Sequence, residues 1–435
     1  MALPPAEEAP QVIAGIKAAS NATPIAIETT EAHGLKDGDE IKIRDVAGNE
    51  AANGSFFARV KEPKTVELFS NSSLTKAIAG TGDYQSGGVM LRSLQDDYGI
   101  IVGINGYVKF KALNGPENDA RRFYNWLTSP TGGCVAIGKT DLILSDLSNP
   151  ASVQPTIEAV NNAFRKYSDQ AYEKDDHWIG RRLYVFLSGH GITPVLTQSA
   201  RTDIAGLLMA NSSPSWPQHV VGQLYAEWFR NAGAFNELVL FMDCCRDLRP
   251  NVSPVGPVTP PVNSDRADEV RFLYGMAAEV DSKAWEVPLP PGSDAQEPRG
   301  VFSYVLMEAL NTPTICDDQG QLTSNALAEH LTRRVTEIRK DQAAKVATSQ
   351  FNPIVFSTGR NTRPTLRVAF NPSLKGKTIV LTRGSETIDQ YMIGELSWSK
   401  PVQKGIYRLA IDGVKQTDLK KIDGTKEVYD VDDFK

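Results

Sequence analysis

The sequence predicts an α/β protein with a mostly parallel central sheet, helices on both faces, and a small all-β domain at each end of the chain. Short, continuous apolar runs such as residues 183–187 and 238–242 are typical of strands buried within a parallel sheet. Stretches with helical spacing separate these runs, as a parallel sheet requires. Near both ends, short alternating runs are broken by glycine turns, which indicates small antiparallel β-domains.

The α/β region opens with an apolar strand at residues 98–104. A polar loop at residues 114–119 follows, and the helix behind it places Ala120, Phe123 and Leu127 on one face. Further helices are expected at residues 155–167, 220–232, 300–311 and 324–340, and a further strand at residues 272–275.

Three domains are expected in this chain of 435 residues, which is long enough to bury more than one core. Residues 1–92 read as a small β-barrel or sandwich, residues 93–360 as the α/β domain, and residues 361–435 as a second small β-domain.

Charge and composition give no sign of a nucleic-acid or membrane partner. The net charge is −6, from 46 basic and 52 acidic residues, whereas nucleic acid or an anionic membrane would call for a basic surface. Residues 1–8 have neither the basic residues nor the apolar core of a signal peptide, and no apolar run reaches about 18 residues. Four scattered cysteines do not form a disulfide framework. We therefore expect a cytoplasmic protein.

Two potential catalytic groups follow buried strands. His190 lies between two glycines directly after residues 183–187, and Cys244 and Cys245 follow residues 238–242. Catalytic groups in open α/β sheets gather at the carboxyl ends of such strands. An imidazole near a thiol can take its proton and later protonate a leaving amine. Alone, His190 could equally be a turn residue satisfied by backbone groups.

These motifs resemble those of the caspase-like cysteine peptidases. Residues 188–191 (Ser-Gly-His-Gly) and 243–246 (Asp-Cys-Cys-Arg) are most similar to the metacaspase and bacterial orthocaspase branch, whose pattern is Asp-x-Cys. The animal caspase signature has Gln where this chain has Asp243, and Gly where it has Asp247. Further similarity covers about residues 97–358, and its other segments are residues 101–107, 113–120 and 300–304. The resemblance implies a caspase-like α/β/α fold and a cysteine endopeptidase.

The nucleophile is expected to be Cys245, because the family pattern puts it two residues after the acid. In a strand, residues i and i+2 face the same side, so Asp243 and Cys245 can address one cleft while Cys244 turns towards the packing. Cys244 remains the alternative, and Cys134 and Cys316 lie outside any motif. The backbone N–H groups of Gly191 and Cys245 are candidates for the oxyanion hole.

Specificity follows from the resemblance. The positions matching Asp119 and Asp243 form the S1 pocket, which receives the residue before the cut, in metacaspase-like enzymes. Two carboxylates attract a cation, so the resemblance implies cleavage after Arg or Lys and not after Asp. The alternative is that Asp119 only caps its helix.

No metal or cofactor is expected. Residues 192–214 contain a single acid, Asp203, and no acid lies between Asp247 and Asp265, whereas calcium needs several oxygen ligands. Calcium activation, which many metacaspases show, is therefore not supported. For an enzyme specific for basic residues, self-cleavage after Arg246 or Arg249 is chemically feasible.

The resemblance implies a protein or peptide substrate and a regulated effector of antiviral defence or cell death, switched on by a partner protein or small molecule. One alternative is a catalytically silent scaffold that binds a partner or nucleotide signal. Another is a phage or virion structural protein, because residues 33–56 resemble small β-modules of phage proteins. Within that module, His33 is expected to shape a turn.

Overall fold

The computed structural model describes residues 12–94, 96–149, 153–196, 203–260, 263–290, 296–312, 315–316, 321–350, 352–357, 364–402, 405–411, 415–422 and 428–434. The segment at residues 1–8, for which no signal peptide is expected, lies outside them. The chain forms two compact units, Met1–Glu308 with Leu331–Ile354, and Ala309–His330 with Val355–Lys435. The division into three domains after residues 92 and 360 remains a prediction.

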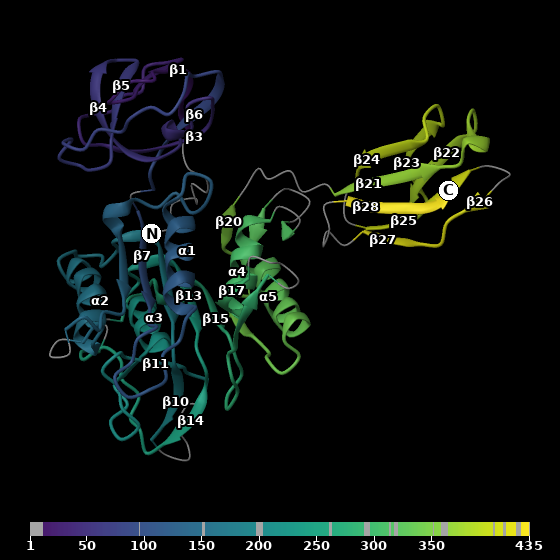
Figure 1. Ribbon diagram of the computed structural model, residues 1–435. Coiled ribbons are helices and arrows are strands. Elements are labelled where there is room, and N and C mark those ends of the chain that lie inside the picture. Colours follow the sequence, from purple (N-terminus) through teal and green to yellow (C-terminus); the bar gives the residue numbers. More distant parts are fainter. Residues whose placement is uncertain are drawn as a thin grey trace. The chain divides into compact units, whose positions relative to one another are not determined.

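A six-stranded sheet forms the centre of the first unit, in the order β19-β15-β13-β9-β7-β8. Figure 1 labels three of its strands, β7, β13 and β15. Its strands are β7 (Asp97–Gly103), β8 (Thr140–Leu144), β9 (Gly180–Ser188), β13 (Phe235–Asp243), β15 (Arg271–Met276) and β19 (Lys345–Thr348). Five of them run parallel, and β19 pairs with β15 in the antiparallel sense. The apolar runs at residues 183–187 and 238–242 thus lie in neighbouring central strands.

Helices cover both faces of this sheet. The aromatic ring of Phe123 in α1 (Pro116–Thr128) lies 4.9 Å from that of Phe186 and 5.8 Å from that of Phe241. On the opposite face, Leu240 packs in one cluster with residues of α2 (Ile157–Tyr172) and α3 (Gly222–Asn231), including Phe229. Because successive side chains of β9 and β13 point to opposite faces of the sheet, each strand packs against the helices on both sides. Two further helices are α4 (Val301–Asn311) and α5 (Ser324–Ile338).

The carboxyl ends of β9 and β13 lie level with each other, with Ser188 opposite Asp243. A second sheet continues beyond them in the order β12-β11-β10-β14, built from β10 (Gly191–Val195), β11 (Gly206–Leu208), β12 (His219–Val221) and β14 (Asp247–Pro250). Strands β10 and β14 pair in parallel, with Ile192 opposite Asp247. The segments that leave the two central strands therefore stay side by side.

An N-terminal barrel closes in the order β1-β2-β5-β4-β3-β6. Its strands are β1 (Val12–Ala19), β2 (Ala26–Thr29), β3 (Glu40–Ala47), β4 (Gly54–Glu62), β5 (Thr65–Phe69) and β6 (Ser86–Arg92). Fully buried side chains such as Ile27, Ile41 and Val66 fill it. The ring of His33 bonds the backbone, since its Nδ1 accepts the N–H of Leu35.

The second unit carries two small sheets, in the orders β24-β21-β28 and β23-β22-β25-β26, with β27 pairing to β25. Their strands are β21 (Thr365–Phe370), β22 (Thr378–Arg383), β23 (Glu386–Met392), β24 (Ser397–Pro401), β25 (Gly405–Ile411), β26 (Lys415–Gln416), β27 (Lys420–Ile422) and β28 (Val428–Phe434). A further pair joins β18 (Leu322–Thr323) to β20 (Val355–Ser357). In the described part of the chain, no helix is both long and apolar enough to cross a membrane.

Candidate active site

The structure brings His190 and Cys245 to one cleft at the carboxyl ends of β9 and β13. The cleft has a volume of about 540 Å³, and both residues line it together with Asp243 and Gly300. The ends of β9 and β13 lie level with each other, and β10 pairs in parallel with β14, so the segments that carry the two residues lie side by side. The position matches the edge at which open α/β sheets place their reactive groups.

Two glycines allow the chain to pass here. A β-carbon on Gly189 would overlap the hydroxyl of Tyr107. A β-carbon on Gly191 would lie 2.5 Å from the carbonyl oxygen of Cys245 and 2.6 Å from the sulfur of Cys244. The two glycines of the Ser-Gly-His-Gly motif are therefore needed because other parts of the chain approach closely, and between them His190 reaches the cleft.

The imidazole of His190 has a defined orientation. Its Nε2 donates to the carbonyl oxygen of Lys111 at 2.8 Å, and its backbone N–H donates to the hydroxyl of Tyr107 at 2.8 Å. The ring packs against the rings of Tyr107 and Phe110, with centroid separations of 4.8 and 5.9 Å. Because a carbonyl can only accept, Nε2 carries the hydrogen of the neutral ring, and Nδ1 remains as the acceptor.

The thiol of Cys245 is half-buried and donates to the carbonyl oxygen of Ala284 at 3.5 Å. Burial raises the pKa of this thiol above its ordinary value, and the negative charge of Asp247 raises it further. Among the described contacts, the thiol and the imidazole of His190 bond separate carbonyls and not each other. The raised pKa and the hydrogen bond to a carbonyl both favour the thiol over the thiolate in this form.

The other three cysteines are buried. Cys244, the alternative nucleophile, is 2% exposed and packs in the core cluster beneath α2 and α3. Cys134 and Cys316 are fully enclosed. Only Cys245 opens to the cleft.

Asp243 is buried and lines the cleft. Its Oδ2 accepts the N–H of Ser303 at 3.0 Å and the Ser303 hydroxyl at 2.6 Å. The pKa of Asp243 is raised to about 7, chiefly by burial and also by the nearby charges of Asp119 and Glu286, while the Ser303 bonds oppose the shift.

Asp119 is 1% exposed and does not line the cleft. Its Oδ1 accepts from Nε of Arg299 at 2.9 Å, and its Oδ2 accepts the N–H of Gly300 at 2.8 Å. Burial raises the pKa of this carboxyl group, while Arg299 lowers it. Both acids thus meet at Gly300, since a β-carbon there would overlap Oδ2 of Asp243. The helix-capping alternative is wrong, because Asp119 lies inside α1 and its two oxygens accept from Arg299 and Gly300.

The two arginines considered for self-cleavage lie in different surroundings. Arg246 is fully buried, and its guanidinium donates to the carbonyl oxygens of Ala278 and Ile204 at 3.3 Å each. Arg249 is exposed and lines the cleft.

Several residues of the site were not predicted from the sequence. Tyr107 and Lys111 orient the histidine, Ser303 holds Asp243, and Arg299 pairs with Asp119. Ser303 falls in the segment of residues 300–304 already noted for its family resemblance, so that pattern could have indicated it. Lys111 acts through its carbonyl group, which no side-chain pattern reveals.

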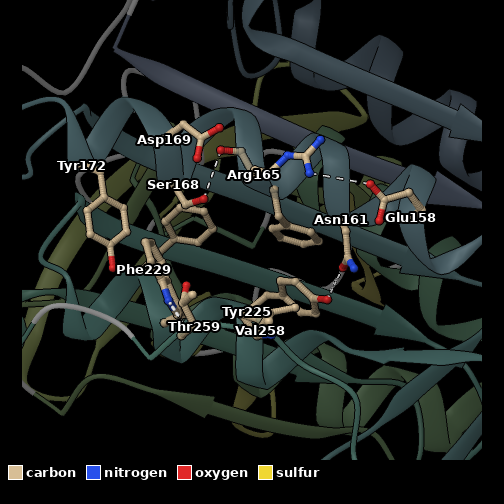
Figure 2. Close-up of a pocket in the computed structure, with 13 residues that line it drawn as sticks. Glu158, Asn161, Arg165, Ser168, Asp169, Tyr172, Tyr225, Phe229, Val258 and Thr259 are labelled. Atoms are coloured by element: carbon tan, nitrogen blue, oxygen red, sulfur yellow. Dashed lines mark hydrogen bonds and ion pairs between the residues drawn. The ribbon is translucent and has the colours of Figure 1, made fainter.

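A second cavity, of about 330 Å³, is lined by residues of α2, α3 and the segment at residues 257–259 (Figure 2). Phe164, Tyr225 and Phe229 form its apolar wall, and the hydroxyl of Tyr225 bonds Asn161. None of the predicted site residues lines it. No group of three or more His, Cys, Asp or Glu side chains within the described ranges is arranged to hold a metal ion.

Known proteins that are similar to this chain include a curated protein and solved caspase structures. A probable protease of a Desulfuromonadales bacterium is 28% identical over 164 residues, which cover 35% of this chain and 18% of that protein's length. Caspase-1 of Spodoptera frugiperda is 13% identical with a TM-score of 0.37, over 62% of this chain and 92% of that one. The structure titled pro-sf-caspase-1 is 14% identical with a TM-score of 0.34, over 60% and 94% of the two chains.

The caspase-domain family, Peptidase C14, matches residues 97–358. This range includes the six-stranded sheet, its helices, His190 and Cys245. Because the match covers more than half of the chain, the protein belongs to the caspase-domain family.

Proposed function

We propose that the protein is a cysteine endopeptidase in which Cys245 is the nucleophile and His190 the acid–base partner. The orientation of the imidazole carries this proposal, because the Nε2 bond to Lys111 leaves Nδ1 as a proton acceptor. Both side chains line one cleft, which could hold a peptide substrate.

The reaction needs one rearrangement. The thiol of Cys245 leaves the carbonyl of Ala284 and passes its proton to Nδ1 of His190. The thiolate then attacks the scissile carbonyl carbon, and the N–H groups of Gly191 and Cys245 are the candidates to stabilise the oxyanion. The imidazolium protonates the leaving amine as the C–N bond breaks, and a thioester remains. Water, deprotonated by His190, hydrolyses the thioester and restores the thiol.

We further propose that the site cleaves after Arg or Lys. Asp243 lines the cleft, and the second acid, Asp119, meets it at Gly300. A guanidinium can bind two carboxylates bidentately, whereas an acidic side chain would be repelled.

An acyloxymethyl ketone probe with Arg next to the reactive group tests this function. We expect its mass to be added to Cys245 in the wild type and to be absent from Cys245→Ala. A matched probe with Asp in place of Arg should label at least about tenfold more slowly. Equal labelling by the two probes would contradict the basic specificity, and labelling of another cysteine would contradict the assigned nucleophile.

A catalytically silent scaffold is the second candidate. It is favoured by the separate carbonyl bonds of the thiol and imidazole and by the raised pKa of Cys245. Failure of the arginyl probe to label Cys245 with any candidate activator would support the scaffold. A virion-associated role, suggested only by the N-terminal module, would be supported by recovery of the protein in assembled particles.

We propose a cytoplasmic effector that is switched on by a partner protein or small molecule, in antiviral defence or cell death. The unassembled dyad is consistent with a need for such a trigger. Self-cleavage, if it is part of the switch, would occur after Arg249 and not after Arg246, because Arg246 is enclosed.

A further inference from the structure

The acid expected to receive a substrate's basic side chain already has a basic partner. Arg299 ends the hairpin formed by β16 (Glu286–Leu289) and β17 (Glu297–Gly300), and its Nε donates to Oδ1 of Asp119 at 2.9 Å. The N–H of Gly300 occupies the other oxygen at 2.8 Å. Each oxygen of Asp119 therefore already accepts a hydrogen bond from the protein, so an incoming guanidinium would have to compete for it.

The guanidinium of Arg299 is itself incompletely satisfied. Arg299 is 8% exposed, and its Nη2 is buried without a hydrogen-bond partner. The group lies over the ring of Tyr304, 5.1 Å from the centroid. A buried N–H without an acceptor destabilises the folded protein. In an ion pair with a purely structural role, we would expect the guanidinium to have all its buried N–H groups bonded.

Two contacts anchor the hairpin that carries Arg299. At one end, the carboxylate of Glu286 accepts the N–H groups of Asn114 and Gly115, at 3.0 and 2.7 Å, just before α1. At the other end, Glu297 forms an ion pair with Arg122 of α1. Glu286 and Gly300 also line the catalytic cleft, so the hairpin forms part of the cleft wall in this form.

We propose that Arg299 is the resident cation of the S1 acid site, and that a substrate's basic side chain gains Asp119 only when Arg299 releases it. The inference rests on the proposed peptidase function and names the residue that regulates its specificity pocket. When a substrate guanidinium replaces that of Arg299, Asp119 still has one ion pair. The exchange therefore adds little binding free energy until the hairpin has moved and Arg299 has left. Asp119 then becomes available beside Asp243, which already faces the cleft.

Benzamidine, a small amidinium ligand, tests this exchange without requiring turnover. Its affinity is measured by calorimetry on the full chain, and its place is checked by protection of Cys245 from iodoacetamide. We expect Arg299→Gln to bind benzamidine at least about tenfold more tightly than the wild type. This is the difference expected if Arg299 has left Asp119 in about a tenth or less of the wild-type molecules. Bound benzamidine should slow alkylation of Cys245. Arg299→Lys, which keeps the charge, is the matched control and should bind as weakly as the wild type.

Unchanged affinity in Arg299→Gln, or binding that leaves Cys245 unprotected, would show that Arg299 is a fixed part of the fold and overturn the proposal. If Arg299→Gln does not fold, Glu297→Gln replaces it, because that change loosens the hairpin without altering the acid site. It should tighten benzamidine binding by about two- to fivefold, as expected for a partly exposed ion pair, and no change would overturn the proposal.

The two proposals can fail separately. Absence of labelling by the arginyl ketone probe would remove the peptidase function, whereas tighter benzamidine binding by Arg299→Gln would still identify Arg299 as the competing cation. Labelling of the wild type together with unchanged benzamidine affinity would leave the peptidase standing and remove the role of Arg299.

Discussion

The Nε2 of His190 donates to the carbonyl oxygen of Lys111 at 2.8 Å, and this bond leaves Nδ1 as the acceptor of the neutral imidazole. A backbone carbonyl therefore orients the proposed catalytic base. A second group, the hydroxyl of Tyr107, accepts the backbone N–H of the same histidine. The base is prepared for proton transfer, while its thiol partner is bonded to Ala284.

Tyr107→Phe should lower kcat about tenfold, because it removes the acceptor that fixes the backbone of His190. It should also lower the free energy of unfolding by about 1 kcal/mol. Tyr98→Phe is the matched control: its buried hydroxyl bonds a backbone carbonyl at 3.3 Å, near the other end of the sheet. Kinetics and urea denaturation should show a similar stability loss in both variants but a lower kcat only in Tyr107→Phe. Equal kcat values would contradict the positioning role.

Alkylation should report the unassembled dyad. Burial raises the pKa of Cys245, so iodoacetamide at pH 7.5 should modify it more slowly than free cysteine. His190→Ala should react at the same rate in this form, since the imidazole does not bond the thiol. The three buried cysteines should remain unmodified. Mass spectrometry of digests measures all four sites, and rapid alkylation that depends on His190 would indicate a preformed ion pair instead.

Asp119→Asn should lower kcat/KM for an arginyl peptide about 100-fold, which corresponds to losing about 2.7 kcal/mol of charge interaction. The same peptide with citrulline, which has the shape of arginine without its charge, should be affected much less. The control is Asp247→Asn, because Asp247 also lines the cleft but pairs with Lys283. If both variants lose activity equally on both peptides, Asp119 is not a specificity residue.

Stability should fall with rising pH because of Asp243. Its pKa in the folded protein is about 7, above the ordinary value of 3.8, so the folded state holds a proton that the unfolded chain releases. The contribution is complete below about pH 4 and is lost by about pH 7, at up to about 1.4 kcal/mol per pH unit. Urea denaturation at several pH values should show this slope in the wild type and a smaller slope in Asp243→Asn. Parallel curves for the two proteins would rule out an elevated pKa.

Much of the sheet could be predicted because its central strands are buried on both faces. Residues 183–187 and 238–242 are continuous apolar runs, and they lie in β9 and β13. The edge strands β8 and β19 could not be found in this way. All five residues of β8 are only half-buried, and its apolar run is limited to residues 142–144. Strand β19 alternates between exposed and half-buried positions and has only two consecutive apolar residues, so neither strand gives the longer run typical of a buried strand.

The site was predictable in its reactive groups but not in its counter-ions. The two-residue spacing of Asp243 and Cys245 places both at the cleft, whereas Cys244 is buried in the core. Nothing local relates Asp119 to Arg299, which lies 180 positions further along the chain. Burial of an acid demands a partner, but only the tertiary structure determines which residue supplies it.

Hydrolysis of an arginyl peptide by the wild type, Cys245→Ala and Cys244→Ala tests the central claim most directly. Purified proteins are assayed with candidate activators, by release of a fluorophore placed after Arg. We expect turnover by the wild type, measurable turnover by Cys244→Ala, whose lost sulfur only packs in the core, and none by Cys245→Ala. Turnover by Cys245→Ala equal to that of the wild type would contradict the assignment of Cys245 as the nucleophile of a cysteine peptidase.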